Sequence, residues 1–160
     1  MIRLAKLVSI TLLVSSAACG GSSDSTTGTN GSNNSGAAMS ATIDGTAWSA
    51  PSPAASYQDT RVTIVGADVS LANSITMSFV AATTGTYSFA LSSTSSAVAI
   101  LTKNKGAQGF STAAQAGGGS VTVTTLTAHH LVGTFAFDAV GTPSSLGTAH
   151  VTNGKFDITF

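Results

Sequence analysis

The sequence predicts an all-β domain over residues 39–160. Apolar residues occupy every second position along most of this region, as in Ile75, Met77 and Phe79, and this is the period of a strand with one buried face. Thr, Val, Ile and Phe fill these segments, and turn residues separate them. No window has the period of an amphipathic helix. About eight or nine such strands predict an antiparallel β-sandwich, with a partly open β-barrel as the alternative.

The expected strands follow one another with short connections. The first alternates from Met39 to Ile43, and Asp44-Gly45 marks a tight hairpin turn, after which the chain returns through Trp48. The other apolar positions of the expected strands are Val62, Ile64, Ala67, Ile75, Met77, Phe79, Tyr87, Phe89, Leu91, Val98, Ile100, Val121, Val123, Phe135, Phe137, Val151, Phe156, Ile158 and Phe160.

Two segments of the domain have similar sequences. Residues 74–79 lead to Gly85-Thr-Tyr-Ser-Phe-Ala90, and residues 120–125 lead to Gly133-Thr-Phe-Ala-Phe137. Either a duplicated hairpin or convergent composition in a Thr-rich chain explains this similarity. Both explanations predict that each segment forms a hairpin.

Residues 1–18 have the three parts of a secretory signal. Arg3 and Lys6 give a positive start, Leu7 to Val14 are mostly apolar, and residues 15–18 are the small residues Ser-Ser-Ala-Ala. The apolar stretch is far shorter than the about 20 residues of a membrane-spanning helix. We therefore expect export and cleavage before Cys19.

Cys19 is the only cysteine, so it cannot form an internal disulfide. Ala17-Ala18-Cys19-Gly20 resembles the bacterial lipoprotein signal, although Ser16 stands where a leucine is usual. The resemblance implies a diacylglyceryl thioether on Cys19 and an amide-linked acyl chain such as palmitate, and two or more chains anchor a protein stably. Membrane lipid is then the expected partner.

Gly20 indicates the destination. In lipoproteins an aspartate at this position commonly causes retention at the inner membrane, so glycine favours the outer membrane. The sequence does not decide between the periplasmic side and the surface-facing side. The alternative is an ordinary secreted protein.

Residues 19–38 are expected to be the lipidated cysteine and a linker. After Cys19 this segment consists of Gly, Ser, Asn, Thr and Ala with one charge, Asp24. Such a composition buries too little apolar surface to fold, so we expect disorder. About 19 residues of this kind have a root-mean-square reach of roughly 25 Å.

The charge of the mature chain excludes one class of partner. Cleavage removes Arg3 and Lys6, which leaves four basic residues against six aspartates, and glutamate is absent. A formal charge of about −2 gives no basic surface for nucleic acid. An envelope protein or a glycan remains as a possible partner.

Three motifs resemble a known family. They are Ala41-Thr-Ile-Asp-Gly-Thr-Ala-Trp48, Gly133-Thr-Phe-Ala-Phe137 and Val151-Thr-Asn-Gly-Lys-Phe-Asp-Ile-Thr-Phe160. They are similar to an uncharacterised family of bacterial lipoprotein domains that opens on an INGxxW-like hairpin and closes on TNGxFxVxF. The resemblance covers residues 39–160 and implies an exported β-rich domain. It brings no catalytic residues with it.

The titratable residues predict neither a metal site nor a catalytic site, and no cofactor is expected. His129 and His130 are neighbours, so on an extended chain their side chains point to opposite faces. The aspartates of the domain are interpreted as turn or strand-end residues. No Gly-x-Ser-x-Gly elbow is present. We expect a non-enzymatic binding or structural module, with a small exported hydrolase as the less favoured alternative.

A third hypothesis is an adhesin-like domain that binds carbohydrate or peptide. Trp48 then serves either as a core anchor or as a ligand platform. Residues 102–119 are the longest weakly patterned stretch, and loops on a β scaffold commonly bind ligands. We therefore expect ligand contacts from Lys103, Lys105 and Phe110 in this stretch. Tyr57, near Pro51 and Pro53, is expected in a surface loop and is the fourth candidate for a ligand contact.

Overall fold

The computed structural model describes residues 38–89, 97–114 and 116–160; Cys19 and Leu91 lie outside these ranges. The described residues form strands and one 3-10 helix, so the predicted all-β class is confirmed. These elements are β1 (Ala38–Ile43), β2 (Thr46–Ala50), β3 (Ala54–Gln58), β4 (Arg61–Ala67), β5 (Ser74–Val80), β6 (Gly85–Phe89), β7 (Val98–Lys103), β8 (Gln108–Ser111), β9 (Gly118–Leu126), β10 (His130–Thr142), η1 (Ser144–Leu146) and β11 (Thr148–Thr159). Among the residues that the structure describes, none form a helix with the length and hydropathy of a membrane span.

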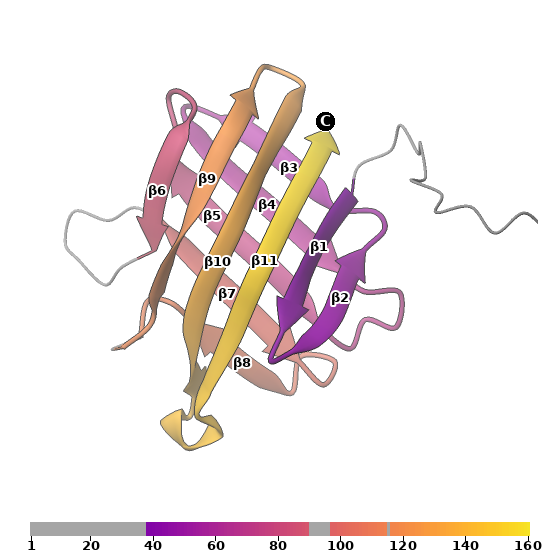
Figure 1. Cartoon of the computed structure of the whole chain (residues 1–160), viewed down its shortest axis with the longest axis vertical. Coiled ribbons are helices and arrows are strands. Elements are labelled where there is room, and N and C mark those ends of the chain that lie inside the picture. Colours follow the sequence, from indigo (N-terminus) through magenta and orange to yellow (C-terminus); the bar gives the residue numbers. More distant parts are fainter. Residues whose placement is uncertain (1–37, 90–96, 115) are drawn as a thin grey trace, which may run out of the picture. The chain divides into compact units, whose positions relative to one another are not determined.

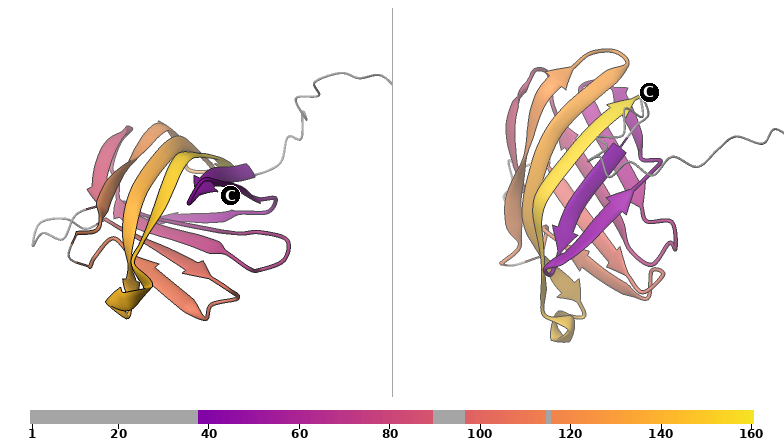
Figure 2. Two further views of the ribbon diagram at one scale, coloured as in Figure 1. Left: turned by 60° about the horizontal axis from the view of Figure 1, so that its bottom comes forward. Right: turned by 45° about the vertical axis from the view of Figure 1, so that its right-hand side comes forward.

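All eleven strands belong to one curled antiparallel sheet. Neighbouring strands pair in the order β2-β1-β11-β10-β8-β7-β5-β4-β3, and β9 pairs with both β10 and β6. The sheet folds over into a front layer (β6, β9, β10, β11, β1, β2) and a back layer (β3, β4, β5, β7, β8), as Figures 1 and 2 show. The first part of β10 pairs with β9, and its last residues pair with β8. The domain therefore has the two facing layers of the predicted sandwich and the continuous curl of a half-barrel.

The β1–β2 hairpin forms where the sequence predicts it. Asp44 and Gly45 both have positive φ, at 47° and 81°. Two consecutive residues with positive φ are typical of the type I′ turn, which Asp-Gly favours. The turn sets the pairing of Ile43 with Thr46 and of Ala41 with Trp48.

One hydrophobic core fills the space between the layers. Phe135 stacks on both Phe137 and Phe156, and Phe89 meets Phe137 edge to face. Trp48 is 7% exposed and therefore a core residue. The largest fully buried side chains are Phe79, Phe89, Phe156, Met39, Ile64, Ile75, Met77, Leu101, Leu131, Ile158, Val62 and Val121.

Two Gly-x-Phe segments pack against one another in the front layer. Gly133 of β10 lies opposite Phe156 of β11, and Phe135 lies opposite Gly154. A Cβ on Gly133 would come within 2.5 Å of the Phe156 ring, and a Cβ on Gly154 within 2.5 Å of the Phe135 ring. Each phenylalanine ring therefore occupies the space that its glycine partner leaves open.

The sequence assigned the wrong face of β7 to the core. Ala99 and Leu101 are buried, whereas Ile100 is 41% exposed. The pairing of Ala99 with Met77 and of Leu101 with Ile75 puts these residues on the core side. Because apolar residues occupy both faces of this strand, the pattern alone does not reveal the register.

Only one of the two predicted hairpins forms. The β9–β10 hairpin is present, but β5 and β6 do not pair. Both edges of β5 are occupied, by β4 and β7. The chain therefore crosses after β5 to the front layer, where β6 pairs with β9.

Strand β3 is an element that the sequence did not predict. β3 includes Tyr57, which was expected in a surface loop, and pairs with β4. Its sequence, Ala-Ala-Ser-Tyr-Gln, has no β-branched residue, which explains why strand propensity did not reveal it. Ala55 and Tyr57 are partly buried and pack against the core.

The Gly-x-Phe packing predicts that Gly133→Ala destabilises the domain by about 3 kcal/mol, because overpacking forces rings and backbone apart. The added methyl would also meet the Thr122 carbonyl at 2.2 Å. Gly109→Ala is the matched control, since nothing lies within 4 Å of a Cβ there. Urea unfolding of both variants measures the difference, and equal stabilities would contradict the packing argument.

Candidate functional site

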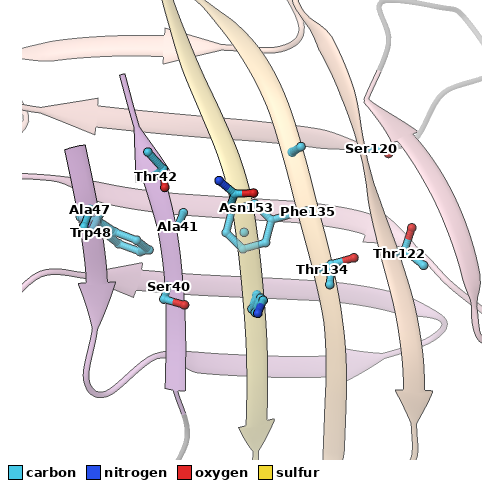
Figure 3. A pocket seen from close by; sticks show the side chains of 13 residues that line it. Ser40, Ala41, Thr42, Ala47, Trp48, Ser120, Thr122, Thr134, Phe135 and Asn153 are labelled. Atoms are coloured by element: carbon cyan, nitrogen blue, oxygen red, sulfur yellow. The ribbon is translucent and has the colours of Figure 1, made fainter. Parts of the chain in front are cut away.

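A large hollow lies on the outer face of the front layer (Figure 3). We call it the outer hollow; its volume is about 720 Å³. It crosses β1, β2, β9, β10 and β11, and most side chains that face it end in a hydroxyl, an amide or an ammonium group. Those polar side chains are Ser40, Thr42, Ser120, Thr122, Thr134, Asn153 and Lys155.

The strand register aligns these side chains in rows. Directly paired residues on one face of a sheet are side-chain neighbours. One row, running from β6 to β2, consists of Thr86, Thr122, Thr134, Lys155, Ser40 and Ser49. The hydroxyls of Thr86 and Thr122 are 2.9 Å apart and hydrogen-bonded. The outward positions of this layer therefore carry an almost continuous line of hydroxyl groups with one cation.

A β-bulge and two alanines shape the hollow. At Asn153-Gly154 the register shifts against both β1 and β10, and Asn153 has a φ of 53°. A bulge increases the local twist and leaves one residue unpaired. The Asn153 side chain consequently lies over the hollow, as Figure 3 shows. Ala47 and Ala136 fill little space beside it.

A second hollow of about 310 Å³ continues the first along the same face. The two share Ser40, Thr134 and Lys155. Lys155 is exposed and makes no ion pair with any residue that the structure describes. It is therefore the cation that a bound ligand would meet between the two hollows.

Two histidine–aspartate pairs lie on β10 and β11 on either side of this region. His130 Nε2 is 2.7 Å from Asp157 Oδ1, and His150 Nδ1 is 2.7 Å from Asp138 Oδ1. Within the described residues, neither imidazole hydrogen-bonds to a serine hydroxyl. In the same part of the chain, no three His, Cys, Asp or Glu side chains cluster as metal ligands do.

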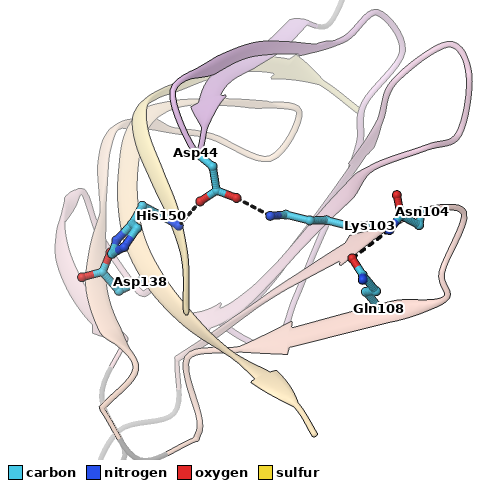
Figure 4. A network of polar contacts seen from close by, with 6 residues as sticks. All are labelled: Asp44, Lys103, Asn104, Gln108, Asp138 and His150. Atoms are coloured by element: carbon cyan, nitrogen blue, oxygen red, sulfur yellow. Dashed lines mark hydrogen bonds and ion pairs between the residues drawn. The ribbon is translucent and has the colours of Figure 1, made fainter. Parts of the chain in front are cut away.

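A polar network joins the layers at one end of the domain (Figure 4). Asp44, in the β1–β2 turn, pairs with Lys103 of β7. The other oxygen of Asp44 accepts the backbone N–H of His150 at 2.7 Å. Burial raises the pKa of Asp44, but the hydrogen bonds from Lys103 and His150 and their positive charges outweigh it, so the pKa lies below its ordinary value.

The four residues predicted to contact a ligand lie away from the outer hollow. Phe110 is 4% exposed, and the Lys103 ammonium lies 4.9 Å from the centre of its ring. Lys105 lies in the β7–β8 turn, whereas Tyr57 lies in β3. The structure thus brings Lys103 and Phe110 together and leaves Tyr57 apart. Their ligand contacts stay a prediction, and Cys19 lies outside the described residues.

Sequence reasoning missed the residues of the outer hollow. Thr122, Thr134 and Lys155 look like the ordinary polar face of a strand, and only the register aligns them. One signal was available: Asn-Gly at 153–154 interrupts an alternating strand, and such an interruption indicates a bulge.

The fold and hollow define an all-β domain with a hydroxyl-lined outer face. A model of the family described as "Domain of unknown function (DUF6252)" matches residues 35–158, and the chain belongs to this family. No curated protein matches the chain, and no solved structure matches it.

The Asp44–Lys103 pair predicts a pH-dependent contribution to stability. Asp44→Asn should cost about 1 kcal/mol at pH 7 and no more, because Asp44 is 39% exposed and solvent screens the pair. The folded pKa is depressed, so this contribution is complete above the unfolded pKa and disappears as the pH falls below about 4. Urea unfolding of both proteins between pH 3 and pH 7, values set by that pKa range, measures it.

Asn tolerates the positive φ that the turn requires, so Asp44→Asn removes the negative charge and leaves the backbone conformation unchanged. Lys103→Met provides the second arm of a double-mutant cycle. If the losses of unfolding free energy in the two single variants simply add in the double variant, the two side chains do not interact. That result, or a loss that does not change with pH, would contradict a stabilising Asp44–Lys103 ion pair.

Proposed function

We propose that this protein is a lipid-anchored, non-enzymatic binding module of the bacterial envelope, and that its outer hollow binds a saccharide. The observation that carries the ligand assignment is the row of hydroxyl side chains across the front layer, with Lys155 in it. The observation that supports the anchor is the position of Cys19, the only cysteine, directly after a signal-like segment.

The chemistry of the hollow suits a polyhydroxylated ligand. Ser and Thr hydroxyls both donate and accept hydrogen bonds, and the Asn153 amide does both with separate atoms. Sugar hydroxyls have the same dual capacity. A volume of about 720 Å³ lies within the ordinary range of small-molecule sites, about 300–1,000 Å³.

The hydrolase alternative has less support. A serine hydrolase requires a hydroxyl within reach of a histidine that an acid orients. His130 and His150 each have an acid partner, but no described serine hydroxyl hydrogen-bonds to either ring. The aromatic platform of the adhesin hypothesis is also weakened, because Trp48 is buried.

The anchor predicts that Cys19→Ala moves the protein from the membrane fraction to the soluble fraction. Without the thiol no lipid can be attached, and no other lipid-bearing residue is expected in the mature chain. Mass spectrometry of the wild type should show an acylated N-terminal Cys19. A wild type that is soluble and unmodified would refute the anchor.

The saccharide site predicts that Thr134→Val weakens glycan binding by about twofold to tenfold, because one net hydrogen bond is lost. Val keeps the shape and the strand propensity of Thr. The probes are purified peptidoglycan sacculi and an array of bacterial envelope glycans, followed by calorimetry on any glycan that binds.

Thr76→Val is the matched control, because Thr76 lies on β5 in the back layer, outside the hollow. The proposal fails if no glycan binds, or if the two Thr→Val variants weaken binding equally.

A further inference from the structure

We propose that the loop from Asp68 to Asn73 is a membrane-contact loop that places Val69 and Leu71 in the headgroup region of a bilayer. The inference uses a different surface from the saccharide site, since no loop residue lines the outer hollow. It rests on the proposed function only in that lipid on Cys19 would hold the loop near a membrane.

The loop contains the two most exposed large apolar side chains of the described residues. Val69 is 86% exposed and Leu71 is 69% exposed; the next values are 42% for Val65 and 41% for Ile100. Val65 and Ile100 lie on strands within the sheet. Val69 and Leu71 instead project from a connection between β4 and β5.

Hydrogen bonds fix the loop in this outward arrangement. The Asp68 carboxylate accepts bonds from the Ser70 hydroxyl at 2.7 Å, from the backbone N–H groups of Ala72 and Asn73 at 2.9 Å, and from the Asn73 side chain at 3.2 Å. The Trp48 indole donates to the Asn73 carbonyl at 3.3 Å. Because the backbone is held at both ends, Val69 and Leu71 cannot fold back onto the core without breaking these bonds.

A cation lies beside the loop. The backbone N–H of Lys105, in the β7–β8 turn, donates to the Ala72 carbonyl at 3.0 Å. Lys105 is exposed and has no ion-pair partner among the described residues. Of the nearby carboxylates, Asp44 is paired with Lys103, whereas Asp68 keeps its negative charge and is hydrogen-bonded by neutral groups of the loop. Lys105 is therefore the group that favours anionic lipid. At a bilayer interface the apolar side chains would enter the headgroup region, and the lysine ammonium would attract anionic lipid phosphates.

The apolar surface is too small for a protein interface. Two aliphatic side chains contribute about 100 Å² each, whereas a specific protein interface buries about 800 Å² per partner, of which a little over half is apolar. A bilayer requires no matching shape, and a weak contact is sufficient where an anchor keeps the local concentration high. The observations therefore favour a lipid surface.

The first test measures vesicle binding without the anchor. The mature chain without its signal segment, carrying Cys19→Ala, is sedimented with an excess of vesicles of phosphatidylethanolamine and phosphatidylglycerol, so that a weak contact is measurable. Adding Val69→Ser and Leu71→Ser together should lower the partition coefficient at least tenfold. Val65→Ser with Ile100→Ser is the matched control, because it removes the same kinds of side chain outside the loop, and it should leave the partition coefficient unchanged. Equal losses in both double variants, or no vesicle binding at all, would overturn the proposal.

The second test locates the loop in the anchored protein. With the Cys19 sulfur acylated, Leu71→Cys supplies the only free thiol for an environment-sensitive dye, and exposed Ser56→Cys in β3 is the control site. The emission should shift to the blue on vesicles at position 71 and not at position 56. A shift that requires added envelope protein would assign the loop to a protein partner and refute lipid contact. A second labelled thiol would show that Cys19 is unmodified, which contradicts the anchor but leaves the vesicle test valid.

Discussion

The reciprocal packing of two Gly-x-Phe segments is the interaction on which the domain depends most. Gly133 faces Phe156, and Phe135 faces Gly154, across the β10–β11 ladder. Both rings fit only because the opposite residue has no side chain. Side chains alternate along a strand, so this core contact also turns the two central residues outward. Those residues are Thr134 and Lys155, which lie opposite one another and line both hollows. The same β10–β11 pairing therefore determines both the packing of the core and the side chains that face the hollows.

The position of β10 extends this constraint to the whole sheet. β10 pairs with β11, β9 and β8 and is the strand that continues the front layer into the back layer. Its inward residues are buried from Leu131 to Gly141. A shift of one residue in register would move all of them to solvent and bring the outward threonines into the core. The register of this one strand thus determines the curl, the core and the row of hydroxyl groups together.

The sequence predicted what depends on local pattern and missed what depends on pairing. Alternation gave the fold class, and Asp44-Gly45 gave the first hairpin, because a turn is encoded by adjacent residues. The β5–β6 hairpin was predicted wrongly, because composition does not reveal that β4 and β7 already occupy both edges of β5. The outer hollow was missed for the same reason: Thr122 and Thr134 become neighbours only through the ladder. Tyr57 and Phe110 look like exposed aromatics of a loop region, yet both contact the core.

β2 and β3 end the main path of the curled sheet and do not pair with one another, so side chains join the layers on the side of β2. Two polar bridges do so: Asp44 with Lys103, and the Trp48 indole with the Asn73 carbonyl. The second bridge ends on the loop that exposes Val69 and Leu71, so the contact that helps to close the half-barrel also holds this loop in position. An apolar loop without such support would gain by covering its side chains, because burial of apolar surface is favourable. Here that movement would break a bond that joins the layers. The sheet architecture therefore maintains the exposure of Val69 and Leu71.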